Sequence, residues 1–159
     1  MNTTQTKKGF TIIEVVLVLA IAGLIFLMVF IALPALQRGQ RDTQRKDDLA
    51  RVNTQLQSYQ SANRGKIPTV TSTGTTAGTI GGFKSKYLTP AAEYTDPQGD
   101  AYTFTNNGAA PTLVGQVGYL PGTLCGTDGA TTTTGAKTRS YTLRMKLENQ
   151  ASLYCIDNR

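Results

Sequence analysis

One long apolar segment dominates the N-terminal part of the chain. Between Val15 and Leu36 no residue carries a charged side chain. At about 1.5 Å per residue, an α-helix of this length can cross a hydrocarbon layer of about 30 Å. The pattern therefore predicts a hydrophobic transmembrane helix, which we place at residues 10–36.

A mixed pattern replaces the apolar one after this segment. From Gln37 to Asn63 there is no proline, and apolar residues recur at three- and four-residue steps, as on one stripe of a helix. We expect residues 37–65 to continue the helix as an amphipathic segment packed on its own domain; a partner-binding helix is the alternative. The stripe consists of Leu49, Val52, Leu56 and Tyr59. The side chains expected to face solvent are Arg45, Lys46, Asp47, Asp48 and Gln57.

Short strand-like segments follow, in residues 66–159. Their clearest example is 139–147, where apolar and polar residues alternate as in a strand with one buried face. The Thr- and Gly-rich segments 69–82 and 127–138 predict surface loops. The expected strands are Ala101–Thr105, Thr112–Leu120, Arg139–Leu147 and Ser152–Ile156. The chain is thus predicted to be α+β, with a long N-terminal helix whose polar half packs on a small antiparallel β-sheet.

The composition excludes several kinds of catalytic site. The chain has 2 Cys and no His, so it lacks the usual general base near neutral pH, and no Ser-His, Cys-His or zinc-ligand pattern can be built. We therefore expect no enzyme activity, no cofactor and no metal site. Cys125 and Cys155 are expected to form one disulfide in an exported, loop-rich domain, rather than to act as reactive thiols.

The net charge of +6 comes from scattered basic residues without a run of five or more. Arg144 and Lys146 share one face of an expected strand. If such a face is repeated along an assembly, weak contacts with DNA or with other surfaces become stronger through multivalency. Plain solvation of these side chains is the simpler interpretation.

Glu14 is an acidic residue at the head of the apolar segment. Ionisable residues within membrane segments are costly and usually functional. If the chain is cut between Gly9 and Phe10, a new α-amino group lies four residues from Glu14. This amine can pair with Glu14 of the same chain or of a neighbouring copy, and the second pairing would fix the register of packed helices. An ordinary signal anchor with one tolerated acid is the alternative.

The string KKGFTIIEVVLVLAIAGLIFLMVF, Lys7 to Phe30, resembles the leader and first helix of type IV prepilins and of the related pseudopilins. The resemblance implies a leader at residues 1–9, cleavage after Gly9 by a prepilin peptidase, methylation of the Phe10 amine, and Glu14 as the assembly carboxylate. It also implies that the helix can unwind between Gly23 and Pro34 in a filament; a kink at Pro34 is the alternative.

A second similarity to pilins and pseudopilins lies ahead of the first expected strand. The segment 94–102 contains Asp96-Pro97-Gln98-Gly99, which is similar to a turn common in these proteins. Asp96 and Asp100 are candidate calcium ligands, but calcium needs 6–8 oxygens, so capping of a turn by a side chain is the preferred interpretation.

The resemblance implies a structural subunit of a type IV pilus that polymerises with copies of itself for adhesion, motility or DNA uptake. Its implied partners are the peptidase, an inner-membrane assembly platform, an assembly ATPase, and membrane lipid before assembly, with DNA or host surfaces as further candidates. A pseudopilin of a type II secretion system, a minor pilin, and a membrane-anchored binding module that does not polymerise are the alternatives.

The expected location is the cytoplasmic membrane with the N-terminus inside, and then the extracellular filament. The Lys and Arg residues after the apolar segment predict the opposite orientation. We follow the processing motif, because long domains cross membranes largely regardless of charge.

Overall fold

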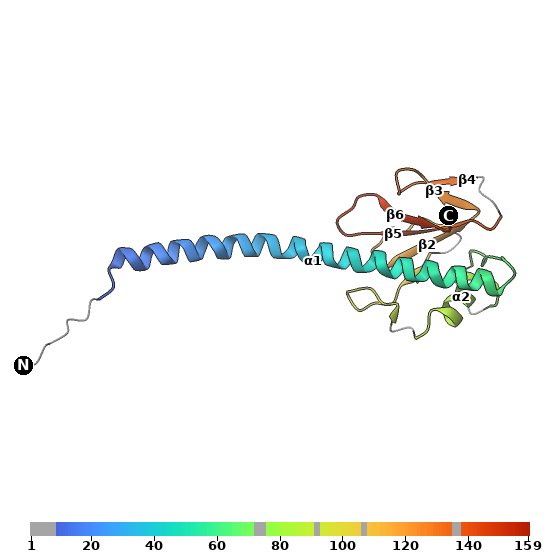
Figure 1. Ribbon diagram of the computed structural model, residues 1–159, viewed down its shortest axis with the longest axis horizontal. Coiled ribbons are helices and arrows are strands. Elements are labelled where there is room, and N and C mark those ends of the chain that lie inside the picture. The colour runs from blue at the N-terminus through green and yellow to red at the C-terminus, as the bar shows by residue number, and fades with distance from the viewer. Residues whose placement is uncertain (1–8, 72–75, 91–92, 106–107, 135–137) are drawn as a thin grey trace, which may run out of the picture. The chain divides into compact units, whose positions relative to one another are not determined.

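The computed structural model describes residues 9–71, 76–90, 93–105, 108–134 and 138–159. The chain divides into two compact units, Met1–Gln37 and Arg38–Arg159, here called unit 1 and unit 2. The elements, all but β1 labelled in Figure 1, are α1 Ile12–Ala62, α2 Ile80–Tyr87, β1 Thr103–Phe104, β2 Gln116–Pro121, β3 Thr123–Cys125, β4 Thr132–Thr134, β5 Tyr141–Lys146 and β6 Leu153–Asp157.

Unit 1 contains the apolar part of α1. The helix begins at Ile12, two residues later than the predicted start at Phe10. It then runs without interruption through Gly23 and Pro34. The helix break expected at these two residues is therefore absent from the described single chain, and unwinding in a filament stays a prediction. The missing N–H of Pro34 removes one hydrogen bond, a local loss that apolar helices can accommodate.

The main sheet of unit 2 has the strand order β1-β2-β5-β6. Strand β5 pairs antiparallel with both β2 and β6, as predicted. The prediction of a purely antiparallel sheet is wrong at the edge, because β1 pairs parallel to β2, with Thr103 opposite Gln116. A parallel neighbour needs a long connection in place of a tight turn, and the segment between residues 104 and 116 provides one.

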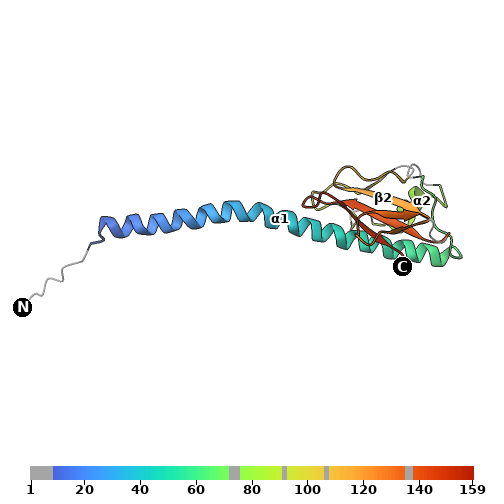
Figure 2. The ribbon, with the colours of Figure 1, turned by 90° about the horizontal axis from the view of Figure 1, so that it is seen from above.

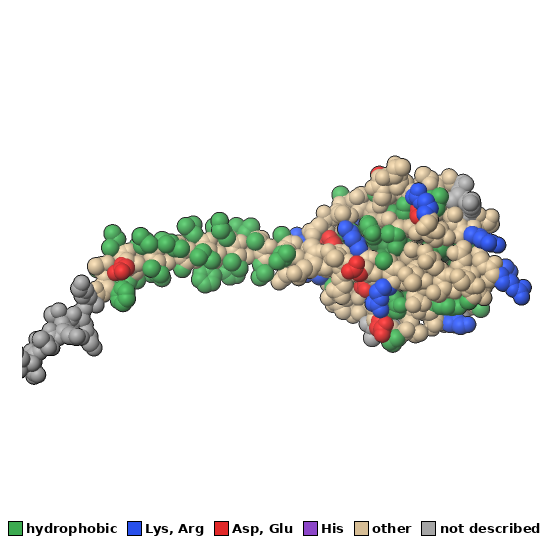
Figure 3. All heavy atoms as spheres, viewed as in Figure 1, with side chains coloured by type: hydrophobic (Ala, Val, Ile, Leu, Met, Phe, Trp, Pro, Cys, Tyr) green, Lys and Arg blue, Asp and Glu red, His purple; other side chains and the backbone are tan. Residues whose placement is uncertain are grey.

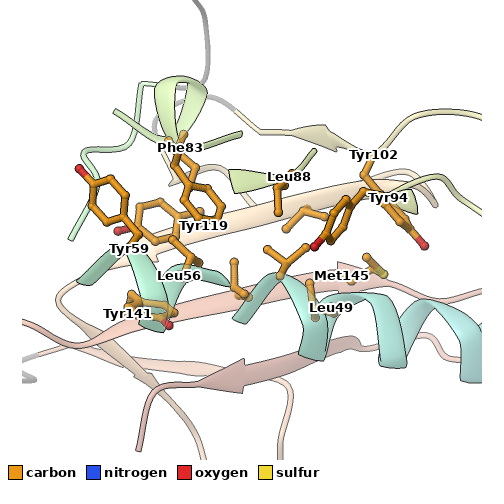
Figure 4. Close-up of a cluster of buried hydrophobic side chains, with 14 of the residues drawn as sticks. Leu49, Leu56, Tyr59, Phe83, Leu88, Tyr94, Tyr102, Tyr119, Tyr141 and Met145 are labelled. Atoms are coloured by element: carbon orange, nitrogen blue, oxygen red, sulfur yellow. The ribbon is translucent and has the colours of Figure 1, made fainter. Parts of the chain in front are cut away.

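The polar half of α1 packs against one face of this sheet (Figure 2). The predicted stripe is confirmed, since Leu49, Val52 and Leu56 are at most 2% exposed and Tyr59 is buried. Figure 4 shows Leu49, Leu56 and Tyr59 among aromatic rings from the strands and from α2. Full burial of one such apolar side chain contributes about 1.5–3 kcal/mol to the free energy of folding. The stripe is therefore a major source of the stability of unit 2. The opposing residues are Phe83, Leu88, Tyr94, Tyr102, Tyr119, Tyr141 and Met145.

Two of the predicted loops contain regular structure. Segment 69–82 ends in the first turn of α2, where the Thr79 hydroxyl accepts a hydrogen bond from the Gly82 amide at 3.1 Å and caps the helix. Segment 127–138 contains β4, which pairs with β3 in a second, two-stranded sheet. Strand β4 consists of threonines without an apolar alternation and is specified by its pairing with β3. Helix α2 has apolar residues at helical spacing, Ile80, Phe83 and Tyr87, but most of it lies beyond the Thr- and Gly-rich segment.

Candidate functional site

The backbone ahead of α1 is extended and exposed. Gly9, Phe10 and Thr11 lie outside the helix, and Phe10 is 85% exposed. A Cβ atom added to Gly9 would meet nothing within 4 Å. The peptide bond between Gly9 and Phe10 is therefore accessible in the uncut chain.

Thr11 and Glu14 together form the start of α1. The Thr11 carbonyl accepts hydrogen bonds from the amides of Glu14 (3.1 Å) and Val15 (3.4 Å). In return, Glu14 Oε2 accepts long hydrogen bonds from the Thr11 amide (3.5 Å) and hydroxyl (3.4 Å). A Thr-x-x-Glu pair of this kind resembles a capping box, in which the acid satisfies a free amide of the first turn. In the uncut chain Glu14 thus has weak, local partners.

A cut after Gly9 changes what Glu14 can bind. The new amine on Phe10 would lie about 6 Å from Glu14 along the helix axis if the helix extended to it. An ammonium and a carboxylate at the edge of a membrane form a strong pair when they meet without competing water. The side chains around Glu14 are apolar, and a shallow hollow is lined by Phe10, Glu14, Val15, Val18 and Leu19.

The rest of unit 1 exposes apolar side chains along α1. The helix is long and apolar enough to cross a membrane, by length and composition. Its large hydrophobic residues are roughly half to four-fifths exposed, among them Leu24, Phe26 and Phe30. Figure 3 shows this apolar surface interrupted by a single acidic group near its start. Within the described part of unit 1, residues 9–37, nothing covers these side chains.

Residues 4–30 match the family model of the prokaryotic N-terminal methylation motif. The chain carries the type IV prepilin signature. This prepilin signature covers Gly9, Phe10, Glu14 and Gly23, and it ends before Pro34. Comparison with the curated proteins and with the solved structures found no match.

A buried ion-pair cluster lies in unit 2, where the sequence predicted solvated charges. Arg45 is 0% exposed, contrary to the prediction that it faces solvent. Its guanidinium binds Asp96 through Nε–Oδ1 (2.5 Å) and Nη2–Oδ2 (2.9 Å). Its Nη1 atom also binds Asp42 Oδ1 (3.2 Å) and Glu148 Oε1 (2.8 Å). The hydrogen bonds to Asp96 are the main reason why the pKa of Arg45 is raised.

Glu148 joins the cluster from the loop between β5 and β6. Both of its oxygens accept hydrogen bonds from Arg41, at 2.9 and 2.6 Å. These bonds, followed by those from Arg45, lower the pKa of Glu148 to about 2. The amide of Glu148 donates to Asp42 at 2.9 Å, so that α1 is bound to this loop from two directions.

Asp48 is buried too, against the same prediction. Its Oδ2 accepts a 2.8 Å hydrogen bond from the Tyr102 hydroxyl. Burial and this bond raise the pKa of Tyr102, which remains protonated as the donor. Asp48 and Arg45 each have a partner in the segment 94–102, and Arg45 has a further one in Glu148, which a helix pattern alone cannot reveal.

The turn at Asp96 is capped by its own side chain. Asp96 Oδ2 accepts a 3.0 Å hydrogen bond from the Gln98 amide, which agrees with the preferred interpretation of this motif. Asp100 is exposed and contributes its carbonyl to the Asp96 amide. Among the described residues, no group of three or more His, Cys, Asp or Glu could hold a metal ion. The cation at Asp96 is the guanidinium of Arg45.

Cys125 of β3 and Cys155 of β6 form a disulfide, with a Cα–Cα distance of 5.9 Å. The disulfide thus ties β6 to the short strand β3. Next to the bridge, Asp157 Oδ2 accepts a 2.8 Å hydrogen bond from the Cys125 amide. Burial opposes ionisation of Asp157, but Arg159 and this amide outweigh it and lower its pKa.

Arg144 and Lys146 are half-buried on β5. Arg144 donates to the Gly108 carbonyl at 3.1 Å, and Lys146 donates to the Ala151 carbonyl at 2.8 Å. The preferred interpretation of plain solvation therefore holds only in part, because both side chains are half-buried and bind neighbouring loops.

Proposed function

We propose that the chain is the structural subunit of a type IV pilus, cut after Gly9, N-methylated at Phe10 and polymerised into a filament. The observation that carries the proposal is the combination of the prepilin signature with an apolar helix that has one acid at its start. A membrane anchor that acts alone needs the apolar surface but has no use for the acid.

The proposed assembly uses the apolar part of α1 as the filament core. Glu14 of one copy pairs with the Phe10 amine of a neighbouring copy, which sets the axial position of each added subunit. The interface is heterologous, with different surfaces meeting, and such interfaces build open helical filaments. Each segment of the chain has one role in this proposal. Residues 1–9 are the leader, 10–36 the core helix, 37–65 the helical continuation and 66–159 the sheet domain.

The partners of this function are a prepilin peptidase, an inner-membrane assembly platform and an assembly ATPase. Before assembly, lipid surrounds the apolar helix, and the chain lies in the cytoplasmic membrane with its N-terminus inside. After assembly, unit 2 lies in the extracellular filament, where the disulfide between Cys125 and Cys155 is expected to persist. The filament would serve adhesion, motility or DNA uptake.

Mass spectrometry of filaments sheared from the cell surface tests processing and assembly together. The expected N-terminal peptide begins at Phe10 and carries one methyl group on its amine. An intact leader on the surface form would refute the proposal.

The amount of this chain in the sheared filaments separates the related alternatives. A major pilin forms most of the mass, whereas a minor pilin or a type II secretion pseudopilin is a trace component. A chain that retains its leader and stays dispersed in the membrane would indicate the anchored binding module instead.

A further inference from the structure

The ion pairs of unit 2 are concentrated where α1 enters it. Six of the seven ion pairs between described residues involve α1 side chains of the segment 41–51, and none involves residues 52–62 of the same helix. Near its end, α1 uses a neutral contact instead, in which the Gln60 side-chain amide donates to the Arg139 carbonyl at 3.1 Å. A buried ion pair is often no more stabilising than apolar side chains of similar volume. Stability alone therefore does not explain why the charged contacts lie at one end of the packed helix.

Two segments that are far apart in the chain hold α1 at this entrance. The first is the turn at Asp96, whose carboxylate accepts two hydrogen bonds from the Arg45 guanidinium of α1. The Asp96 amide also donates to the Asp100 carbonyl at 2.7 Å, which keeps the turn closed. The side chains of Arg45 and Asp96 are 0% and 4% exposed, so water does not compete for the hydrogen bonds between them.

The second segment is the loop after β5. Both carboxylate oxygens of Glu148 accept hydrogen bonds from the Arg41 guanidinium. The amides of Glu148 and Asn149 donate to the Asp42 carboxylate, each at 2.9 Å. The side-chain amide of Gln98, from the first segment, donates to Glu148 at 3.4 Å, so the two segments also contact each other. The loop lies within the part of the chain that the disulfide closes covalently.

The order of contacts along α1 places these charged groups ahead of the hydrophobic core. Unit 2 begins at Arg38, and the charged contacts start at Arg41, whereas Leu49 is the first buried apolar residue of the helix. Helix α1 is the covalent connection between the two units, so a force between them reaches Arg41 and Arg45 before it reaches the core. Apolar contacts are non-directional, whereas hydrogen bonds weaken steeply when their geometry changes. The charged groups therefore oppose the first displacement of the helix.

We propose that this cluster is a mechanical clamp, which keeps α1 seated in unit 2 when the helix is pulled from its unit 1 end. The clamp consists of Arg41, Asp42, Arg45, Asp96 and Glu148. Its use in the organism rests on the proposed function, because a filament that is held through its core helices and touches a surface through unit 2 is under such a pull. The resistance itself is a property of the single chain, and it is measured without a filament.

Single-molecule pulling of the full chain in neutral detergent micelles tests the clamp. One handle is attached to the thiol of Gln37→Cys and the other follows Arg159, and the lifetime of folded unit 2 is measured at constant force. Arg41→Ala should shorten this lifetime by about tenfold or more, as loss of hydrogen bonds between charged groups predicts. The matched control is Arg51→Ala, which removes another ion pair of α1, with Glu93, but at a position beyond the clamp. Its lifetime should stay near that of the parent chain.

The direction of the pull separates a clamp from a general source of stability. In a second set of molecules the first handle is moved to Ser61→Cys, near the other end of α1, so that the force no longer reaches the clamp first. Here Arg41→Ala should leave the lifetime near that of the parent chain. The two native cysteines form the disulfide, so each new thiol reacts selectively with its handle. Circular dichroism without force confirms that unit 2 is folded in every variant.

Three results would overturn the inference. The first is an unchanged lifetime of Arg41→Ala when the chain is pulled at residue 37. The second is equal shortening by Arg41→Ala and Arg51→Ala, which would show that the position along α1 does not matter. The third is equal shortening by Arg41→Ala in both pulling directions, which would make the cluster a general source of stability. A chain that forms no filaments but shows the direction-dependent effect would keep the clamp and refute only the proposed function.

Discussion

Arg45 of α1 and Asp96 of the turn before β1 form a fork-to-fork ion pair inside unit 2, with N–O distances of 2.5 and 2.9 Å. The two residues are 51 positions apart in the chain. Because both side chains are almost fully buried, the pair fixes the rotation of α1 relative to the 94–102 segment. The same guanidinium reaches Glu148, so one cation holds three parts of unit 2 together.

Arg45→Met should destabilise unit 2 by about 3–5 kcal/mol, because it leaves Asp96 and Asp42 buried without their cation. Urea unfolding of the full chain in detergent, followed by near-UV circular dichroism, measures the loss. Arg38→Met is the control, since Arg38 is exposed and should change stability by about 0.5 kcal/mol or less. Equal effects of the two substitutions would contradict the assignment of the buried pair.

The stability of unit 2 should fall as the pH decreases from about 4.5 to about 2. The folded-state pKa of Glu148 is about 2, lowered first by Arg41 and then by Arg45, against an ordinary value of 4.5. A depressed carboxyl pKa gives stability that is present above the unfolded-state value and is lost as the pH falls through the folded-state value. Unfolding midpoints measured across this window should therefore decrease steadily.

Glu148→Gln should lower stability near neutral pH by about 1.5–3 kcal/mol, as expected for lost hydrogen bonds between charged groups, and should flatten the acid part of the profile. The exposed Asp47 provides the control Asp47→Asn, which should keep the parental pH dependence. A Glu148→Gln profile as steep as that of the parent chain would show that other carboxylates cause the acid loss.

Cys125→Ser should lower the stability of unit 2 by about 3–4 kcal/mol in the chain-entropy model, since the bridge closes a loop with a sequence separation of 30. Thermal unfolding of oxidised samples measures this loss as a lower Tm. Reduction of the parent chain should produce a similar decrease, which separates the bridge from any effect of the serine. An unchanged Tm in Cys125→Ser would argue against the disulfide.

Glu14→Ala should leave membrane insertion intact and abolish or severely reduce filaments. Insertion becomes easier, because removal of an acid from an apolar segment saves up to about 2.5–3.5 kcal/mol on insertion scales. Membrane fractionation measures the first effect, and electron microscopy of surface filaments measures the second. Glu93→Ala, which removes an exposed acid of unit 2, should retain filaments. Normal piliation in Glu14→Ala would contradict the proposed pairing with the Phe10 amine.

The sequence predicts those features that depend on local pattern. The apolar helix, the stripe from Leu49 to Tyr59 and the buried apolar face of β5 all follow from periodicity. The alternation along β5 predicts that its other face is in solvent, whereas Thr142 on that face is buried against Thr123 of β3. The buried state of Arg45 does not follow from any local pattern. A charged residue next to Lys46 and Asp47 indicates a solvated face, and its partners Asp96 and Glu148 are far away in the chain.

The other differences between the predicted and the observed fold also depend largely on contacts between segments that are distant in the sequence. Strand β4 lies in Thr- and Gly-rich sequence and is specified by pairing with β3. Helix α2 begins at the end of such a segment, at the Thr79 cap, and packs Ile80 and Phe83 into the core. The parallel placement of β1 depends on how a long connection returns to β2, which the residues of β1 do not encode. At the candidate site, Gly9, Phe10 and Glu14 were recognisable because their chemistry lies within a few consecutive residues.

The uncovered apolar side chains of unit 1 have an energetic consequence for any assembly they enter. A helix of this kind gains almost no hydrophobic free energy by leaving lipid for a bundle of its own kind, because hydrocarbon tails and leucine side chains are equally apolar. The hydrophobic contribution to the free energy of this exchange is therefore close to zero over most of the helix length. Whether a copy stays in the membrane or joins the assembly then depends on packing and on the few polar contacts. Addition and removal of single copies are therefore readily reversible.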